Sequence, residues 1–265
     1  MEALRNNLKY SFEFAELIDL NVMTAASAEA KIFFEKTESE KLFFVKKDYY
    51  DAGYRSIKNK ELYMLRHKNE FSACSILAES LHELCKKILC NVACELKLAP
   101  SLFLDLIDET AIPKTGYGNS LMRLNHYKAQ PGNREDILSE AHQDLGVLTL
   151  ICPVETPALE IYDYLKYDWV DVETHQEKNK IIIMVGESLS TITNHYYLPA
   201  THRVLCPTQN RTSLVYHLRF RNDAILDSKL FESEVTGKFH KPFRMTGEAY
   251  LKSETSVRKS VNGSY

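Results

Sequence analysis

Two histidines and one aspartate stand in a pattern that could bind a metal ion. His142 and Asp144 open the apolar run 145–153, and His202 follows much later, in the segment 199–204. On a strand, residues i and i+2 point to the same side, so His142 and Asp144 can share one metal ion. Two imidazoles and one carboxylate are the facial ligand set of non-haem Fe(II), which leaves coordination positions open. The sequence therefore predicts an iron site at these three residues.

An arginine and a serine follow shortly after the second histidine. Arg211 and Ser213 open another strand-like run, 214–220, and their spacing places both side chains on one face of the strand. Arginine offers a charged, planar fork of donors and serine offers a hydroxyl, a combination that suits a carboxylate. We expect these two residues to hold a carboxylate group together.

Four longer stretches carry a resemblance to a known family. His142–Leu150 is similar to the motif His-Thr-Asp-x-Gly-x-Leu-Thr-Leu, and 157–161 with 169–170 is similar to Pro-Gly-Leu-Gln-Val and Trp-Val. Val185–Leu189 resembles the Gly-Asp-x-Leu segment before the distal histidine, and Arg123–Tyr127 resembles an Arg-x-Asn-Tyr-Tyr strand. In these motifs the chain resembles the isopenicillin N synthase-like branch of the 2-oxoglutarate/Fe(II) dioxygenases.

The resemblance implies a role for each of these residues. The metal would be Fe(II), with no catalytic residue beyond its ligands His142, Asp144 and His202. The co-substrate 2-oxoglutarate would be held by four side chains: Arg211, Ser213, Tyr127 and Asn125. Such enzymes use O2 to hydroxylate or desaturate a small molecule and release succinate and CO2. Halogenating relatives replace the carboxylate ligand with a small residue, so Asp144 points to oxygenation.

Two alternative functions stay open from the sequence. One is an oxidase of the same fold that uses Fe(II) and O2 without 2-oxoglutarate. The other is a non-catalytic relative that binds or senses a ligand. The intact triad and the intact Arg-x-Ser pair favour the enzyme, and Tyr127 together with Asn125 favours the use of 2-oxoglutarate.

Two residues are predicted to line the substrate pocket. His217 falls on the same strand face as Arg211 and Ser213, at a place where the family often has Phe, and we expect it to offer a hydrogen bond to the substrate. Tyr54 follows a glycine in the tyrosine-rich connector 46–60, which lies near the mouth of the site in the family. A core histidine and a tyrosine-lined surface turn are the alternative interpretations.

The order of the expected elements indicates a mainly β protein with a helical flank. Helical patterns occupy 25–44 and 71–98, whereas short strands separated by turns run from 120 to 220, as in a jelly roll or barrel. We expect a double-stranded β-helix (jelly-roll) core preceded by N-terminal α-helices. Residues 1–265 would form a single oxygenase domain, with three parts: a mostly helical flank 1–117, a core with the metal site 118–222, and a C-terminal tail 223–265.

Some local expectations accompany this fold. A turn is expected at 131–133, followed by a polar loop up to Ala141, and His82 is expected to face solvent because it lies off the apolar stripe of its helix. The six cysteines, four of them between 74 and 94, are expected to be thiols in a reducing compartment, because they lack the paired spacing of a zinc site.

Composition limits the partners. The net charge of −3 gives no general attraction to nucleic acid or to an anionic membrane, and no apolar run is long enough for a transmembrane helix. The first residues, Met-Glu-Ala-Leu-Arg, do not form the basic and apolar regions of a signal peptide. We expect a cytoplasmic monomer that binds a small-molecule substrate, without a nucleic-acid or membrane partner.

Overall fold

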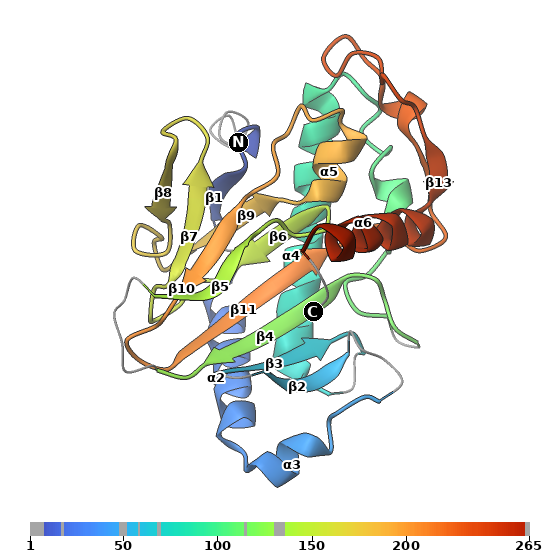
Figure 1. The fold of residues 1–265 in the computed structure, drawn as a ribbon. Helices are drawn as coiled ribbons and strands as arrows, with labels where there is room; N and C mark the ends of the chain where they lie inside the picture. The colour runs from blue at the N-terminus through green and yellow to red at the C-terminus, as the bar shows by residue number, and fades with distance from the viewer. Residues whose placement is uncertain are drawn as a thin grey trace.

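The computed structural model describes residues 8–16, 19–47, 52–57, 59–67, 70–113, 116–129 and 136–262. Two antiparallel sheets form its centre (Figure 1). The larger sheet contains, in spatial order, β1 (Phe12–Glu16), β9 (Lys180–Val185), β6 (Leu148–Ile151), β11 (Arg211–Leu218), β4 (Leu121–Tyr127), β3 (Lys60–Leu65) and β2 (Gly53–Ile57). The smaller sheet contains β5 (Ile137–His142), β10 (His202–Leu205), β7 (Leu159–Asp163) and β8 (Asp168–Asp171).

Helices cover the outer face of the larger sheet. The two long ones, α2 (Leu20–Glu35) and α4 (Ser72–Glu95), pack on each other and on β11. The remaining elements are α3 (Glu38–Leu42), η1 (Leu104–Leu106), α5 (Glu187–Ile192), β12 (Ile225–Asp227), η2 (Ser228–Phe231), β13 (Arg244–Thr246) and α6 (Gly247–Asn262). This arrangement confirms the predicted double-stranded β-helix core with a helical flank. No helix in the described ranges is both long and apolar enough to cross a membrane.

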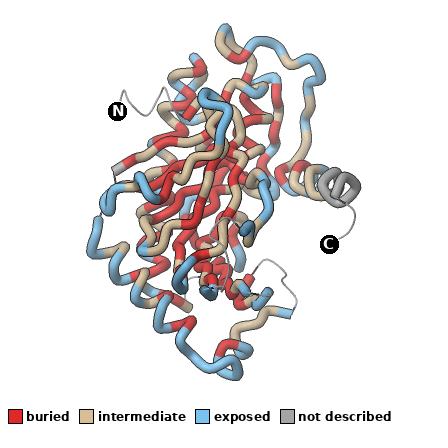
Figure 2. The backbone as a smooth tube through the Cα atoms, turned by 60° about the vertical axis from the view of Figure 1, so that its left-hand side comes forward, coloured by how far each residue is buried: buried red, intermediate tan, exposed pale blue. Residues whose placement is uncertain are grey.

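The larger sheet separates two apolar layers, because successive side chains of a strand point to opposite faces. On the helix side, Leu150 and Tyr216 join the buried faces of α2 and α4 in the main core. Between the sheets, Ile151 and Val215 belong to a smaller core with residues of β7 and β9. Figure 2 shows buried residues running through the strands and the inner sides of the helices. Fewer apolar side chains fill the layer between the sheets than the layer beneath the helices, so the layer between the sheets has room for polar side chains.

The structure corrects the predicted position of Tyr54. Part of the connector 46–60 is the strand β2, and residues 48–51 lie outside the described residues. The ring of Tyr54 is only 1% exposed and lies 6.0 Å from the ring of Phe33 on the helix side, and its hydroxyl donates to Glu61. The alternation of β2 turns Tyr54 away from the space between the sheets, so its predicted place in the substrate pocket is wrong.

Three local predictions also differ from the structure. The pattern over 25–44 forms two helices, because the Thr37 side chain and Glu40 build a capping box that starts α3. The polar segment before Ala141 is the strand β5, although 131–135 lie outside the described residues. His82 is fully buried, with its ring nitrogens 2.8 Å from the Tyr216 hydroxyl and 3.0 Å from the Asp108 carbonyl. A helical pattern cannot reveal such a distant partner.

The predicted division of the chain also cuts across the structure. Strands β1 to β3 lie within 1–117, yet they extend the larger sheet. The segment 223–265 contributes the buried side chains of Leu226, Phe231 and Tyr250 to the main core. The flank and the tail are therefore parts of the same packed body as the jelly-roll core.

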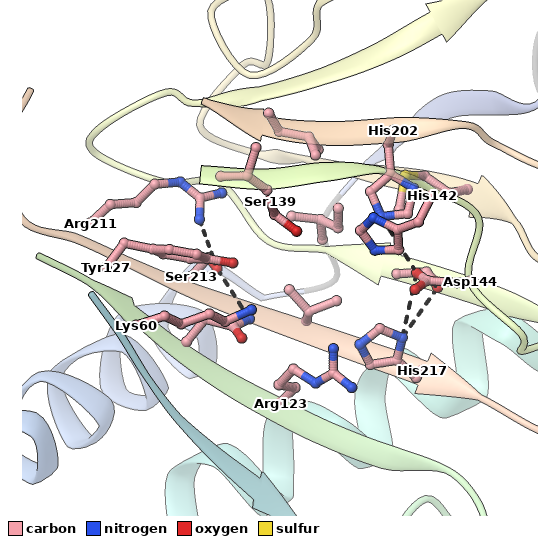
Figure 3. A pocket seen from close by; sticks show the side chains of 17 residues that line it. Lys60, Arg123, Tyr127, Ser139, His142, Asp144, His202, Arg211, Ser213 and His217 are labelled. Atoms are coloured by element: carbon pink, nitrogen blue, oxygen red, sulfur yellow. Dashed lines mark hydrogen bonds and ion pairs between the residues drawn. The ribbon is translucent and has the colours of Figure 1, made fainter. Parts of the chain in front are cut away.

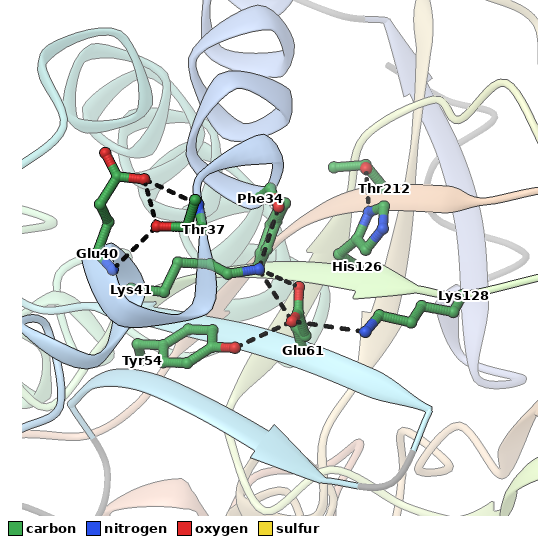
Figure 4. A network of polar contacts seen from close by, with 9 residues as sticks. All are labelled: Phe34, Thr37, Glu40, Lys41, Tyr54, Glu61, His126, Lys128 and Thr212. Carbon is green, nitrogen blue, oxygen red and sulfur yellow. Dashed lines mark hydrogen bonds and ion pairs between the residues drawn. The ribbon is translucent and has the colours of Figure 1, made fainter.

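A buried charge network joins α3 to the sheet (Figure 4). The Lys41 ammonium lies 2.9 Å from both carboxylate oxygens of Glu61, and the hydroxyl of Tyr54 donates to the same carboxylate. Lys41 and Glu61 are 5% and 6% exposed. Burial alone raises the pKa of Glu61, but the hydrogen bonds from Lys41 and Tyr54 outweigh it and lower the pKa. Glu61 therefore stays charged and depends on Lys41.

We expect Lys41→Met to destabilise the fold by about 3 kcal/mol, because it leaves a buried carboxylate without its main counter-charge. Lys31→Met is the control, since Lys31 pairs with Glu155 where both side chains are largely exposed, and its loss should cost less than about 1 kcal/mol. Urea unfolding of both variants measures the two values. Equal losses would contradict a structural role for the Lys41 network.

Candidate metal and co-substrate site

The three predicted metal ligands come together between two paired strands of the smaller sheet. His142 ends β5 and His202 begins β10, and the two residues are direct cross-strand partners. Asp144 follows β5, and one ligand atom from each residue lies within 4.8 Å of the others. His142 is exposed whereas His202 is buried, so the metal position is open on one side. These distances fit a single ion held by two imidazoles and one carboxylate.

Backbone hydrogen bonds orient both imidazoles. Nδ1 of His142 lies 2.8 Å from the carbonyl of Glu140, and Nδ1 of His202 lies 3.0 Å from that of Ala200. A carbonyl only accepts, so each Nδ1 carries a proton, and the neutral form of each ring then presents its lone pair at Nε2, as metal ligation requires. Although the residue His142 keeps contact with solvent, protein atoms surround most of its ring, and this desolvation, followed by the neighbouring His202, lowers the pKa of His142. The two rings are therefore oriented so that Nε2 of each is left for a cation.

The Asp144 carboxylate is held by polar neighbours from the larger sheet. The Thr149 hydroxyl donates to Oδ2 of Asp144 at 2.7 Å, and Nδ1 of His217 lies 3.6 Å from the same oxygen. Burial alone raises the pKa of Asp144, but the nearby imidazoles of His217, His202 and His142 and the Thr149 hydroxyl outweigh it and hold the pKa well below its usual range. Asp144 is therefore a carboxylate at neutral pH.

Two glycines allow the Asp144 loop to pack closely on α5 and β11. A Cβ on Gly186 would lie 2.0 Å from the carbonyl oxygen of Gly146, and a Cβ on Gly146 would lie 2.6 Å from that of Leu218. The Glu187 amide also donates to the carbonyl of Asp144 at 2.8 Å. These contacts explain the glycine at position 186: the start of α5 docks closely on the loop that carries the metal-binding carboxylate.

The triad lines one part of a cavity between the sheets, with a volume of about 70 Å³ (Figure 3). The antiparallel pairing of β4 and β11 places the other predicted residues along its floor. Tyr127 is opposite Arg211, Asn125 is opposite Ser213, and Leu121 is opposite His217. The structure thus brings together every predicted metal and co-substrate residue, together with His217, and leaves out only Tyr54.

Arg211 is held by an internal carboxylate that the sequence did not reveal. Its Nη2 lies 2.5 Å from Oε1 of Glu173, and both side chains are almost completely buried, at 3% and 0% exposed. The other Glu173 oxygen accepts the amides of Ala158 and Leu159 at 2.8 and 3.0 Å. Nη1 of Arg211 donates to Ser213 Oγ at 3.1 Å. The charge of Arg211 is therefore matched within the protein.

A second cation lies on the other side of Tyr127. Lys60 of β3 is the cross-strand partner of Tyr127, and its Nζ is 4.9 Å from the ring centroid, while Cζ of Arg211 is 5.0 Å from it. Lys60 lines the cavity and forms no ion pair within the described parts of the chain. Burial alone raises the pKa of Tyr127, but Lys60 and Arg211 outweigh it and lower the pKa. Lys60, Tyr127 and Arg211 form what we name the cationic row.

Residues 118–220 match the family model of the 2OG-Fe(II) oxygenase superfamily. This segment is a 2OG-Fe(II) oxygenase domain. Among curated proteins, clavatol oxidase claD of Penicillium crustosum is 30% identical over 204 residues, which is 72% of this chain and 54% of that protein. The 2-oxoglutarate-dependent dioxygenase ecdG of Aspergillus rugulosus is 26% identical over 121 residues, 43% of this chain and 35% of that protein. The chain thus spans about a third to a half of the length of these relatives.

Solved structures of the superfamily share the fold over almost the whole chain. A full-length protein of Neurospora crassa, solved in complex with alpha-KG, has a TM-score of 0.79 at 16% identity and covers 96% of this chain and 89% of that one. The dioxygenase for auxin oxidation in rice has a TM-score of 0.73 at 15% identity, and the match covers 97% of this chain and 89% of that one. Identities this low show the fold alone. The cofactors that the sequence predicted, Fe(II) and 2-oxoglutarate, are those for which the superfamily is named.

Sequence reasoning missed several polar residues of this superfamily site. Thr149 lies inside the motif that starts at His142, but the motif gave it no role. Lys60 opens β3, a strand that the sequence analysis did not predict and whose other residues are all buried. Glu173 follows β8 and has no local signal, because its partner Arg211 lies 38 residues away.

We expect Glu173→Ala to destabilise the protein by about 3–5 kcal/mol, because it leaves Arg211 as a buried, unmatched cation and removes the acceptor of two buried amides. Glu160→Ala is the matched control on β7, since Glu160 pairs with the half-buried Arg203 and its removal should cost about 1 kcal/mol or less. Thermal and urea unfolding compare the two variants. A Glu173→Ala protein as stable as the control would contradict this role.

Proposed function

We propose that this protein is an Fe(II)/2-oxoglutarate-dependent oxygenase that hydroxylates or desaturates a small molecule, with release of succinate and CO2. One observation carries the proposal: the metal-binding triad and the cationic row line the same cavity. A co-substrate with a chelating keto acid at one end and a carboxylate at the other fits both. Membership of the superfamily supports the same reaction.

The residues of the triad fit Fe(II). Both histidines present Nε2 lone pairs, and Asp144 presents a carboxylate that Thr149 orients by a hydrogen bond. Bound Fe(II) would supply the activation of O2 and the oxidation of the substrate. The protein's own part is to hold the three ligands in place and to leave the side of the exposed His142 open for the other reactants.

The cationic row would hold the distal carboxylate of 2-oxoglutarate. Because Glu173 matches the charge of Arg211, the excess positive charge at this end of the cavity comes from Lys60. The hydroxyls of Tyr127 and Ser213 add hydrogen-bond donors. Nδ2 of Asn125 donates to Ser213 Oγ at 3.4 Å. Arg211 would act as a positioned donor and Lys60 as the main attracting charge.

Further predictions from the sequence belong to the same proposal. The motifs around the triad support the isopenicillin N synthase-like branch of the superfamily. All six cysteines are free thiols, which supports the reducing conditions of the cytoplasm. We keep the expectation of a monomer, and the low net charge supports the expected absence of a nucleic-acid or membrane partner.

Anaerobic addition of Fe(II) and 2-oxoglutarate should produce a weak visible charge-transfer band, because a chelated keto acid interacts with the metal electronically. His202→Ala should abolish the band, since it removes a buried ligand. Arg211→Ala should leave the band but require a higher concentration of 2-oxoglutarate. Iron binding without a band in the wild-type protein would favour an oxidase that does not use the keto acid, and absence of iron binding would favour a non-catalytic relative.

We expect Lys60→Met to raise the dissociation constant of 2-oxoglutarate about tenfold, a loss of about 1.4 kcal/mol, because the excess charge at the distal carboxylate disappears. The binding of 2-oxopentanoate, which has the keto acid but no distal carboxylate, should not change. Lys31→Met serves as a surface control. Equal effects of Lys60→Met on both keto acids would show that Lys60 does not act on the distal carboxylate.

A further inference from the structure

We propose that Arg123 forms a subsite for an anionic group of the substrate, so that the substrate class is a small organic acid carrying a carboxylate. The inference rests on the proposed function and adds the kind of molecule that the enzyme accepts. Arg123 belongs to the Arg-x-Asn strand motif, and neither the metal nor the co-substrate has given it a role.

The arginine lines the cavity and has no hydrogen-bond or ion-pair partner among the residues that the structure describes. It lies on β4, on the same inward face as Asn125 and Tyr127, and lines the cavity with the triad. Its Nε is buried without a hydrogen-bond partner, and no ion pair of Arg123 exists within the described ranges. Figure 3 shows its guanidinium pointing into the cavity beside His217. A partly buried guanidinium with unused donors is a ready site for a carboxylate.

The other charges of the cavity would all have partners once iron and the co-substrate are bound. Glu173 matches Arg211, and Lys60 would match the distal carboxylate of the co-substrate. The two positive charges of Fe(II) would be matched by Asp144 and by the keto-acid carboxylate. Arg123 is then the cation that remains without an anion in the loaded site. An uncompensated charge is costly in a desolvated site, so the substrate is expected to bring the missing negative charge.

Arg123 is also displaced from the position of the distal carboxylate. It lies four residues from Tyr127 along β4, which is roughly 13 Å at the rise of a β-strand. Its cross-strand partner is Val215, between Ser213 and His217. The positive end that would hold 2-oxoglutarate and the Arg123 subsite are therefore separate places along the floor of the cavity.

His217 complements Arg123 in this subsite. Thr149 donates its hydroxyl proton to Asp144, so it accepts from Nδ1 of His217, which lies 3.3 Å away. Nε2 of His217 is then a lone-pair acceptor, and it is buried without a hydrogen-bond partner among the described residues. The subsite thus offers donors from Arg123 and an acceptor from His217, which suits a carboxylate with a hydroxyl or N–H group nearby. The sequence placed His217 in the pocket, and the tautomer indicates that it accepts a hydrogen bond.

The test compares two ligands of the same shape, phenylacetate and phenylacetamide, by calorimetric titration of the protein loaded with Mn(II) and 2-oxoglutarate. Wild-type protein should bind phenylacetate saturably and at least tenfold more tightly than the amide. Arg123→Met and Arg123→Gln should both lose this preference, and Arg123→Lys should keep part of it. Arg221→Met is the control, because Arg221 pairs with Asp223 at an exposed position.

Several results would overturn the inference. One is that neither phenylacetate nor the smaller acetate binds saturably to the wild-type protein. Another is that the preference for the carboxylate survives in both Arg123→Met and Arg123→Gln. The last is that Arg123→Met loses as much affinity for 2-oxoglutarate as Arg211→Ala does. The last result would assign Arg123 to the co-substrate. Failure of wild-type protein to bind 2-oxoglutarate is a separate result, because it would refute the proposed function itself.

Discussion

The antiparallel register between β4 and β11 is the constraint on which the site depends. It places Tyr127 opposite Arg211 and Asn125 opposite Ser213, with all four side chains on the inner face of the larger sheet. A shift of one residue would turn this whole set of side chains toward the helices. The register is fixed because the alternate residues, such as Leu124 and Tyr216, fill the main core beneath α2 and α4. The packing of the larger sheet against the helices therefore determines which side chains face the cavity on its other side.

A second pairing brings the metal ligands together. The direct partnership of His142 and His202 across β5 and β10 brings two imidazoles to one point, although the residues are far apart in the sequence. The Asp144 loop reaches the same point because it packs against Gly186 and the start of α5. Each ligand thus stands on or beside a strand, and hydrogen bonds to the backbone or to Thr149 hold its orientation before any metal binds.

The cavity and its wall contain charged side chains to which the sequence motifs gave no role. The cost of burying these charges depends on whether each one has a partner inside the protein. Burying Arg211 is tolerated because Glu173 lies against it and is itself held by two backbone amides. Lys60 and Arg123 also line the cavity, and neither forms an ion pair with a carboxylate among the described residues. Buried charges that lack internal partners are costly to fold and useful in binding, because a ligand of opposite charge relieves them.

The sequence by itself determined the features that have a local signal. The two long helices were predicted because helical periodicity indicates a buried stripe. The triad and the Arg-x-Ser pair were predicted because residues i and i+2 on a strand share a face. It also placed His217 in the cavity wall. Only the tertiary structure decided that Tyr54 faces the helices, that His82 is buried, that Glu173 pairs with Arg211, and that Lys60 and Arg123 line the cavity. These depend on strand pairing and on partners far apart along the chain, which no local pattern encodes.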